Sequence, residues 1–278
     1  AEKEKAFQAM FPELREEQTE ARKVKQKVPI LVILGNPPYN AFAGTATTKE
    51  ERDSVAPYKE GLIKKWGIKK FNLDDLYVRF FRMAERRIAE QTGRGVVSFI
   101  SNHSWIEEPS FVVLRQHLLQ SFDVFWIENL HGNRKISEYA PDGRTSETIF
   151  AIPGFSVGIR QGVATSLWVK KTEKTAEPKI HFRDDLNTAR AVERRKQLLD
   201  SLGIKDFNSY YQFASPSESN RYSFRPSKVS SEYLAWPSLE NLTDFKPTLG
   251  ILENRKEALI DIDKHIIENR MKLYYDPN

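Results

Sequence analysis

The sequence predicts an α/β fold with a doubly wound sheet, and three observations support this prediction. Short aliphatic runs recur at Ile30–Leu34, Val96–Ile100 and Val124–Ile127. Amphipathic segments long enough for helices separate these runs, and glycines or prolines flank the first two. Buried strands of parallel sheets have such uninterrupted aliphatic runs, and strands that alternate with helices are typical of doubly wound sheets.

The composition excludes several classes of protein. Hydrophobic residues make up 40% of the 278 residues, and no run approaches the roughly 18 to 20 apolar residues of a membrane helix, so we expect a folded, soluble chain without a membrane partner. The chain has no cysteine, which excludes disulfides and thiolate zinc sites and makes the cytoplasm the expected location. The five histidines lack ligand spacing, so no metal site is expected. A net charge of +5 permits binding to a polyanion without requiring it.

The first strand is predicted to end at Gly35. Residues 1–27 are crowded with Glu, Lys, Arg and Gln and are expected to form a helical leader before it. Pro37 and Pro38 follow the strand, and because proline has no N–H to donate, they turn the chain away from the sheet. The polar stretch from Asn40 to Lys70 is expected to be a long mobile loop over a site.

Two amphipathic helices are predicted between the strands. The first is expected to have Asn72 as its N-cap, with Asp75 three residues later, and to end at Gly93. Its core face is expected to carry Leu73, Leu76 or Tyr77, Phe80, Ala84 and Ile88. The second helix is expected from Ser110 to Phe122, with Val113, Leu114, His117 and Leu118 on one side.

Further strands are expected at Thr148–Ile152, Val163–Lys171 and Lys179–Phe182, and the last two are expected to close the sheet as an antiparallel hairpin. Near residue 185 the composition of the sequence changes. A helix from Ala189 to Leu202, a stretch rich in aromatic residues, Ser and Pro, and a basic helical tail follow. The sequence therefore predicts one region over 28–185 and a second, α+β region over 186–278.

The segment with the clearest chemistry is Asn36-Pro37-Pro38-Tyr39, at the carboxyl end of the first strand. Open α/β sheets bind their ligands at this edge. An exocyclic amine that is conjugated with its ring becomes nucleophilic when acceptors draw electron density onto the nitrogen. The Asn36 side-chain oxygen and the Pro37 carbonyl can each accept one amino hydrogen. The two prolines fix the direction of that carbonyl, and the Tyr39 ring can stack on a planar substrate.

With this tetrapeptide the chain resembles N6-adenine DNA methyltransferases, and in particular the methyltransferase part of type ISP, single-polypeptide restriction-modification enzymes. The resemblance extends to Asp75–Phe81, Gly95–Asn102, Leu130–Lys135 and Gly162–Ala164. It implies that 28–185 form the distal half of a Rossmann-like methyltransferase sheet and that 186–278 begin a target-recognition region. It also implies site-specific methylation of a flipped adenine in double-stranded DNA, with S-adenosylmethionine as the cofactor.

The resemblance assigns roles to further residues. A second aromatic holds the flipped base in this family, and the matching segment Thr148-Ile149-Phe150 makes Phe150 the candidate here. The target-recognition region implies DNA contacts in the basic and aromatic stretch 221–228, where Arg221, Arg225 and Lys228 are the candidates.

One family feature is missing from the sequence. No strand followed by G-x-G precedes Asn36, although the family binds S-adenosylmethionine through such a turn. We therefore expect the upstream part of the same polypeptide, or a partner chain, to complete the sheet.

Three readings of the function stay open. The first is adenine-N6 methylation of DNA by a restriction-modification enzyme. The second keeps the amino-methyltransferase chemistry but has RNA or a protein glutamine as the substrate. The third is a non-catalytic DNA-binding or coupling fragment that retains the tetrapeptide.

Overall fold

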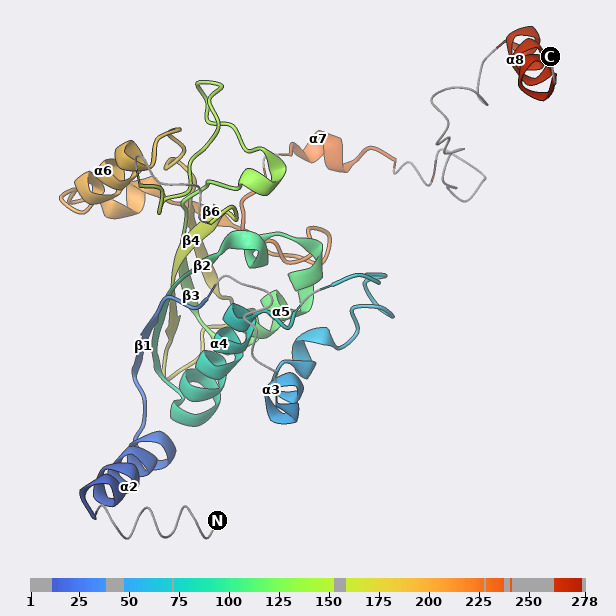
Figure 1. Cartoon of the computed structure of the whole chain (residues 1–278). Coiled ribbons are helices and arrows are strands. Elements are labelled where there is room, and N and C mark those ends of the chain that lie inside the picture. Colours follow the sequence, from blue (N-terminus) through green and yellow to red (C-terminus); the bar gives the residue numbers. More distant parts are fainter. Residues whose placement is uncertain are drawn as a thin grey trace. The chain divides into compact units, whose positions relative to one another are not determined.

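The computed structural model of the chain describes residues 12–38, 48–71, 73–152, 159–227, 229–237, 241 and 263–276. The chain divides into two compact units, Ala1–Ser227 and Lys228–Asn278. The described part of the second unit contains the helices α7 (Ser231–Leu234) and α8 (Lys264–Tyr275). All other elements belong to the first unit, which carries the sheet (Figure 1). No helix of the described residues is long and apolar enough to cross a membrane.

The first unit is built around a six-stranded mixed sheet in the order β1-β2-β4-β3-β5-β6. The strands are β1 (Val32–Gly35), β2 (Gly95–Asn102), β3 (Val124–Asn129), β4 (Val163–Lys170), β5 (Lys179–Arg183) and β6 (Gln212–Ala214). β1 pairs parallel with β2 and β3 with β5, whereas β4 lies antiparallel to both β2 and β3. The α/β class and the three strands expected in the first half of the chain are confirmed.

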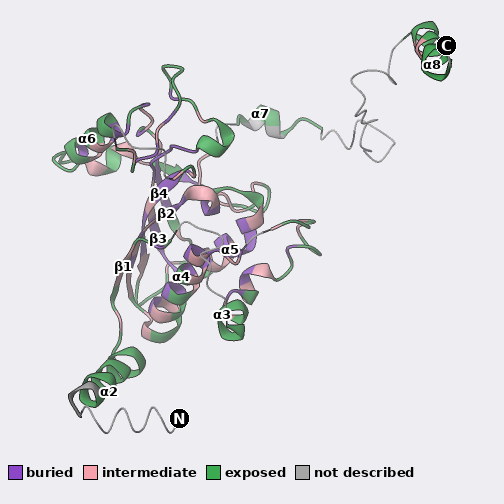
Figure 2. Cartoon of the chain, in the orientation of Figure 1, coloured by how far each residue is buried: buried purple, intermediate pink, exposed green. Residues whose placement is uncertain are grey.

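Helices cover one face of the sheet. Between β1 and β2 lie α3 (Lys49–Ser54), the 3-10 helix η1 (Ala56–Lys59), α4 (Leu76–Glu85) and the π-helix η2 (Arg86–Thr92). Between β2 and β3 lie η3 (His103–Ile106), η4 (Pro109–Phe111) and α5 (Val112–Ser121). Figure 2 shows buried residues in the sheet and in the flanking helices α4 and α5.

An aromatic cluster forms the centre of this layer. The Phe81 ring of α4 stacks on Phe99 of β2 with centroids 5.5 Å apart, and it meets Trp168 of β4 edge-on at 4.7 Å. Such ring pairs contribute about 0.5–1.5 kcal/mol beyond the area that they bury. Gly35 opposes Phe99 in the β1–β2 ladder, and a Cβ atom there would lie only 2.8 Å from that ring. The last residue of β1 is therefore small because the core ring fills the adjacent space.

The opposite face of the sheet keeps large apolar side chains exposed. One row crosses all six strands in register, and its members are Leu34, Ser98, Leu167, Trp126, His181 and Phe213. Leu34 is 74% exposed and Phe213 67% exposed. β1 forms one edge of the sheet in the described part of the chain, and Val32 is exposed there beside Leu34.

The helix α2 (Pro12–Lys27) precedes β1 and agrees with the helical leader expected over 1–27, of which residues 1–11 lie outside the described part. α6 (Ala191–Ser201) agrees with the helix expected from residue 189 to 202. A 3-10 turn, η5 (Arg134–Ile136), follows β3, and another, η6 (Phe207–Tyr210), precedes β6.

The predicted closing hairpin is wrong. β4 and β5 run in opposite directions, but β3 lies between them. The buried carboxylate of Asp123 explains how the connection crosses β3: it accepts the backbone N–H groups of Lys171 at 2.8 Å and Thr175 at 2.7 Å. These bonds hold the connection at the start of β3, so that β5 joins the far side of that strand. The strand expected at Thr148–Ile152 is also absent, and this segment is irregular.

Two local predictions before β2 are wrong as well. The expected mobile loop from Asn40 to Lys70 contains α3 and η1, and in its described part Val55, Tyr58 and Leu62 are fully buried in the core. α4 begins at Leu76 with Asp75 before it, whereas the expected cap, Asn72, lies outside the described residues.

The expected core face of α4 is wrong at one position, because Phe81 is buried and Phe80 is 38% exposed. The three-to-four spacing allowed either ring to face inward. The aromatic cluster around Trp168 takes up Phe81.

Candidate functional site

The candidate site lies at the edge of the sheet where β1, β2 and β3 end. These three strands run in the same direction, because β1 is parallel to β2 and β4 is antiparallel to both β2 and β3. The segments that follow them, beginning at Asn36, His103 and Leu130, therefore leave the sheet at one edge. In open α/β sheets this edge binds ligands.

The first of these segments carries the predicted tetrapeptide. Asn36 directly follows β1, and its side chain is exposed, as is Pro38, whereas Pro37 is buried. Tyr39 lies outside the described residues. Because Gly35 pairs with Phe99 in the parallel ladder, Asn36 leaves the sheet beside the last residues of β2, level with Ile100 and two residues before β2 ends.

A cavity of about 540 Å³ opens at the same edge of the sheet, at the ends of β2 and β3. Its walls come from the start of α4, the end of β2, the loop after β3 and the residues before β4. The lining residues are Lys70, Phe71, Asp75, Tyr77, Asn102, Ser104, Glu108, Ser110, Phe111, Asn133, Lys135, Ile136, Gln161 and Gly162. Asn36, Pro37, Pro38 and Phe150 do not line it.

The cavity contains polar groups that can bind a planar polar ligand. Tyr77 is fully buried in its wall, and its hydroxyl has no hydrogen-bond partner among the described residues. Burial, together with the nearby carboxylates of Asp75 and Glu108, raises the pKa of Tyr77, which keeps the hydroxyl protonated. A buried hydroxyl without a partner is costly, so a ligand atom within reach of it would relieve that cost.

Asn133 is the polar wall residue whose position the structure explains best. Its backbone N–H donates to Oε2 of Glu138 at 2.7 Å, and its Nδ2 donates to Nε2 of His103 at 3.3 Å. His103 in turn donates from Nδ1 to the side-chain oxygen of Asn129 at 3.2 Å. The chain of bonds from β3 through His103 therefore sets the direction in which the Asn133 amide faces the cavity.

The loop after β3 has an unusual backbone. His131 has φ +54° and Gly132 φ +84°, so two successive residues lie in the left-handed region. A Cβ atom at Gly132 would lie 2.6 Å from Cα of Thr148 and 2.7 Å from the carbonyl oxygen of Glu147. Only glycine allows this close approach, and the loop after β3 consequently packs directly against the segment before Phe150.

The imidazole of His131 lies between two carboxylates. Its Nδ1 is 2.6 Å from Oε1 of Glu138, and its Nε2 is 3.3 Å from Oδ1 of Asp184. Burial alone lowers the pKa of His131, but the hydrogen bonds to Asp184 and Glu138 outweigh it and raise the pKa to about 9. Burial raises the pKa of Glu138, yet the bond from His131 and the N–H of Asn133 bring it down to about 2. An imidazolium with two carboxylates thus stabilises this loop near neutral pH.

The predicted base-stacking residue lies in an irregular segment. Phe150 is 38% exposed, and the preceding Ile149 is buried in a small cluster with Leu130, Val163 and Leu186. This arrangement leaves part of the Phe150 ring accessible to solvent.

The predicted DNA contacts differ in their surroundings. The Arg225 guanidinium forms ion pairs with Glu107 at 2.6 Å and Asp184 at 3.1 Å, so its charge is already neutralised. Arg221 is exposed, and its carbonyl oxygen accepts two bonds from the buried Arg115, at 3.2 and 2.8 Å. Its φ of +53° belongs to a tight turn that Arg115 holds. Lys228 lies outside the described residues.

Sequence reasoning missed the cavity residues Tyr77, Asn102, Asn133 and Lys135 and the pairing of His131 with Glu138. A signal was available: Tyr77, Asn102, His131, Asn133 and Lys135 all lie within the segments that carry the family resemblance. Their assembly depends on strand ends and loops that only the tertiary structure places together.

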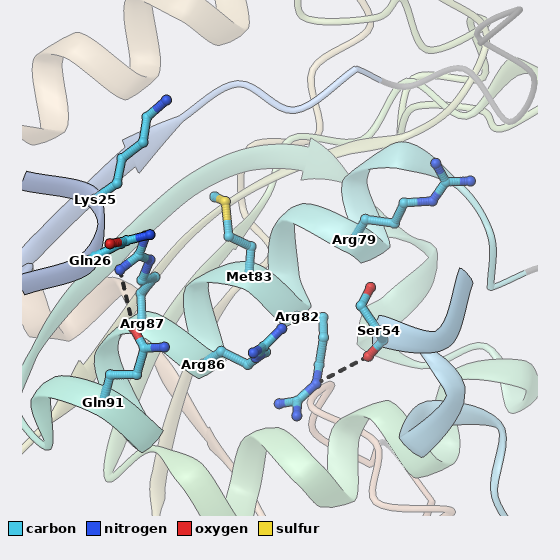
Figure 3. A pocket seen from close by; sticks show the side chains of 9 residues that line it. All are labelled: Lys25, Gln26, Ser54, Arg79, Arg82, Met83, Arg86, Arg87 and Gln91. Atoms are coloured by element: carbon cyan, nitrogen blue, oxygen red, sulfur yellow. Dashed lines mark hydrogen bonds between the residues drawn. The ribbon is translucent and has the colours of Figure 1, made fainter. Parts of the chain in front are cut away.

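A second cleft, of about 450 Å³, lies between the end of α2 and the α4–η2 helix (Figure 3). Its basic lining residues are Lys25, Arg79, Arg82, Arg86 and Arg87. Arg82 is bonded to Glu85 at 2.7 Å and to Glu90 at 2.5 Å. Because acidic neighbours neutralise part of this cleft, the cavity at the strand ends is the better candidate site.

Comparison with known proteins finds similarity to one family and to several solved structures. Residues 2–136 match the family described as Eco57I restriction-modification methylase. The chain is similar to the ATP-dependent Type ISP restriction-modification enzyme LlaBIII bound to DNA, with 28% identity over 77% of this chain and a TM-score of 0.61. It is also similar to DrdV in a DNA complex, with 26% identity over 74% of this chain and a TM-score of 0.60.

A third solved structure covers more of the chain. A nuclease-deletion mutant of the Type ISP enzyme LlaGI, in complex with a DNA substrate mimic, matches 91% of this chain at 25% identity with a TM-score of 0.60. The chain spans only 14%, 19% and 24% of LlaBIII, DrdV and LlaGI, respectively. A comparison with curated proteins found no significant match. Slightly less than half of the chain, residues 2–136, is thus similar to the Eco57I restriction-modification methylase family.

Proposed function

We propose that this chain is the part of a restriction-modification methyltransferase that binds and activates the substrate amine. In this proposal the enzyme methylates N6 of an adenine that is flipped out of double-stranded DNA. The observation that carries the proposal is the position of Asn36, Pro37 and Pro38, which follow β1 directly at the edge of the sheet where the cavity also opens; Tyr39 comes next in the sequence. The methylase family and the DNA complexes of LlaBIII, DrdV and LlaGI support it. The sheet order is consistent with the distal half of a Rossmann-like methyltransferase sheet, and the expected location in the cytoplasm rests on the family and the sequence.

In this proposal the chain's own residues activate the amine. The Asn36 side-chain oxygen and the Pro37 carbonyl each accept one amino hydrogen, which draws electron density onto the nitrogen. Pro37 is buried and Asn36 is exposed, so the carbonyl is held rigidly while the amide remains accessible to a base. Tyr39 stacks on one side of the flipped adenine and Phe150 on the other.

S-adenosylmethionine supplies an electrophilic methyl group when it is bound. The residues of this chain do not fit its main binding turn, because no strand followed by G-x-G precedes Asn36. We assign that turn to the upstream part of the polypeptide or to a partner chain. β1 is an edge strand of the sheet in the described part of the chain, so such a polypeptide would continue the sheet there.

DNA recognition is assigned to 186–278 as the start of the target-recognition region. Arg221 is the strongest candidate for a phosphate contact, because it is exposed next to a fixed turn. Arg225 and Lys228 remain proposed contacts, although the ion pairs of Arg225 leave its charge less available.

Product analysis tests the proposal. The chain, together with the polypeptide that supplies the cofactor turn, is incubated with tritiated S-adenosylmethionine and DNA that carries no prior methylation. We expect the label in N6-methyladenine after digestion to nucleosides. Parallel reactions contain RNA or a glutamine-containing protein in place of DNA. Label in either of these would support the second reading instead, and DNA binding without any transfer would support a non-catalytic coupling fragment.

A further inference from the structure

We infer that Arg195 of α6 is a positioning residue for Phe150. The inference rests on the proposed function, in which the Phe150 ring holds the flipped base. The segment around Phe150 has no regular secondary structure, so its direction depends on tertiary contacts. α6 provides most of these contacts.

Arg195 brackets Phe150 along the backbone. Its Nη1 donates to the carbonyl oxygen of Ile149 at 2.6 Å and to that of Ala151 at 3.1 Å. The two carbonyls belong to the residues immediately before and after Phe150. Because one guanidinium nitrogen binds both, rotation of the intervening peptide units breaks at least one charge-assisted bond.

The neighbouring side chains of α6 hold the segment just upstream. Arg194 is fully buried and donates to the carbonyl of Glu147 at 2.7 Å and to the Ser146 hydroxyl at 2.8 Å. In the opposite direction, the Glu147 carboxylate accepts a hydrogen bond from the backbone N–H of Ala191, at the start of α6, at 2.9 Å. The helix and the segment 146–151 are thus tied together in both directions.

The loop after β3 closes the other side. Gly132 approaches the backbone of Glu147 and Thr148 so closely that no larger residue fits, and the buried Ile149 side chain packs with Leu130. Phe150 therefore projects from a segment that is held between this loop and α6. A ring that is ordered before the base arrives need not lose conformational freedom upon binding, which favours the flipped state.

The contact between Arg195 and the segment around Phe150 joins two regions that the sequence analysis separates. The sequence places 186–278 in the region of target recognition, yet α6 (Ala191–Ser201) holds a segment of the region expected to be catalytic. Arg195 is thus a physical link between the two regions.

The test separates positioning from general stability. 4-Fluorophenylalanine is placed at position 150, and fluorine NMR is recorded for the chain, for Arg195→Gln, for Arg195→Lys and for Lys196→Gln. Lys196 is exposed on the same helix, and its substitution removes the same charge. We expect the resonance to shift or broaden in Arg195→Gln, to be partly restored in Arg195→Lys, and to be unchanged in Lys196→Gln.

The second part of the test is a double-mutant cycle. It measures the methylation rate of the chain together with the polypeptide that supplies the cofactor turn. Phe150→Ala is expected to lower methylation about tenfold, Arg195→Gln by a similar factor, and the double variant by less than a further twofold. An unchanged fluorine spectrum in Arg195→Gln would overturn the positioning role. So would a loss of methylation in the double variant equal to the product of the losses in the two single variants. Full methylation by Phe150→Ala would instead overturn the base-holding role of Phe150 in the proposed function.

Discussion

The imidazole of His131 and the carboxylate of Glu138 form a short, largely buried ion pair, with Nδ1 and Oε1 2.6 Å apart. The pair bridges the two ends of the loop that carries Asn133 into the cavity, and Glu138 also accepts the backbone N–H of Asn133. Asp184 binds the other ring nitrogen of His131. The shape of this cavity wall therefore depends on the protonation state of one histidine.

The first prediction is a pH-dependent contribution of His131 to stability. Its pKa is raised to about 9 from the ordinary value of 6.5, so its contribution is complete below pH 6.5 and is lost as the pH rises through 9. Glu138, with its pKa lowered to about 2 from 4.5, contributes fully above pH 4.5 and loses its contribution as the pH falls toward 2. The shift in His131 corresponds to about 3 kcal/mol.

His131→Asn is the suitable variant, because asparagine tolerates the positive φ of this position while removing the charge. Urea denaturation should show the largest loss of unfolding free energy relative to the parent near pH 6 and a smaller loss at pH 9.5. An equal loss at both pH values would contradict the ion-pair account.

The second prediction concerns Asn36. Asn36→Ala should lower methyl transfer by a hundredfold to a thousandfold, or about 3 to 4 kcal/mol, because it removes one acceptor from a preorganised site. DNA affinity should stay nearly unchanged. Asn208→Ala, an exposed substitution on η6 at a residue that does not line the cavity, is the matched control. Transfer above a tenth of the parent rate would exclude the proposed role of Asn36.

The third prediction concerns Tyr39. Tyr39→Ala should lose base stacking, worth about 1 to 3 kcal/mol, whereas Tyr39→Phe or Tyr39→Trp should keep most of it because the ring face makes the contact. The fluorescence of an adenine analogue at the target position reports the flipped state. A loss in Tyr39→Phe as large as in Tyr39→Ala would assign the contact to the hydroxyl.

The fourth prediction separates Arg221 from Arg225. Arg221→Glu should lower the slope of log affinity against log salt by about one unit, since one phosphate contact is lost. Arg225→Gln should mainly lower the thermal midpoint, because Glu107 and Asp184 would lose their shared partner. If the slope is the same in the parent and in Arg221→Glu, Arg221 makes no phosphate contact and this turn is a solvated loop.

The fifth prediction is that residues 1–278 alone bind S-adenosylmethionine weakly or not at all, because the sequence lacks the Gly-rich turn before Asn36. Calorimetric titration of the chain measures this directly. Micromolar binding at one site per chain would show that other residues replace the turn.

Local patterns in the sequence were sufficient for the order and type of most elements. β1, β2 and β3 follow from aliphatic runs, and α4 and α5 from apolar spacing, because burial imposes these periods on neighbouring residues. Asn36 also directly follows a strand that pairs parallel with its neighbour, as the sequence predicts.

Strand order and the walls of the cavity required the tertiary structure. β4 lies between β2 and β3 because distant strands pair there, and no local pattern distinguishes that arrangement from a hairpin with β5. Phe81 rather than Phe80 faces the core because the rings of β2 and β4 lie on that side. The contacts of Arg195 with the flanks of Phe150 join residues more than 40 positions apart. The sequence by itself thus determined the helices and strands and the residue types of the candidate site. Pairing between distant strands decided how the site is assembled, because that pairing depends on all the elements at once.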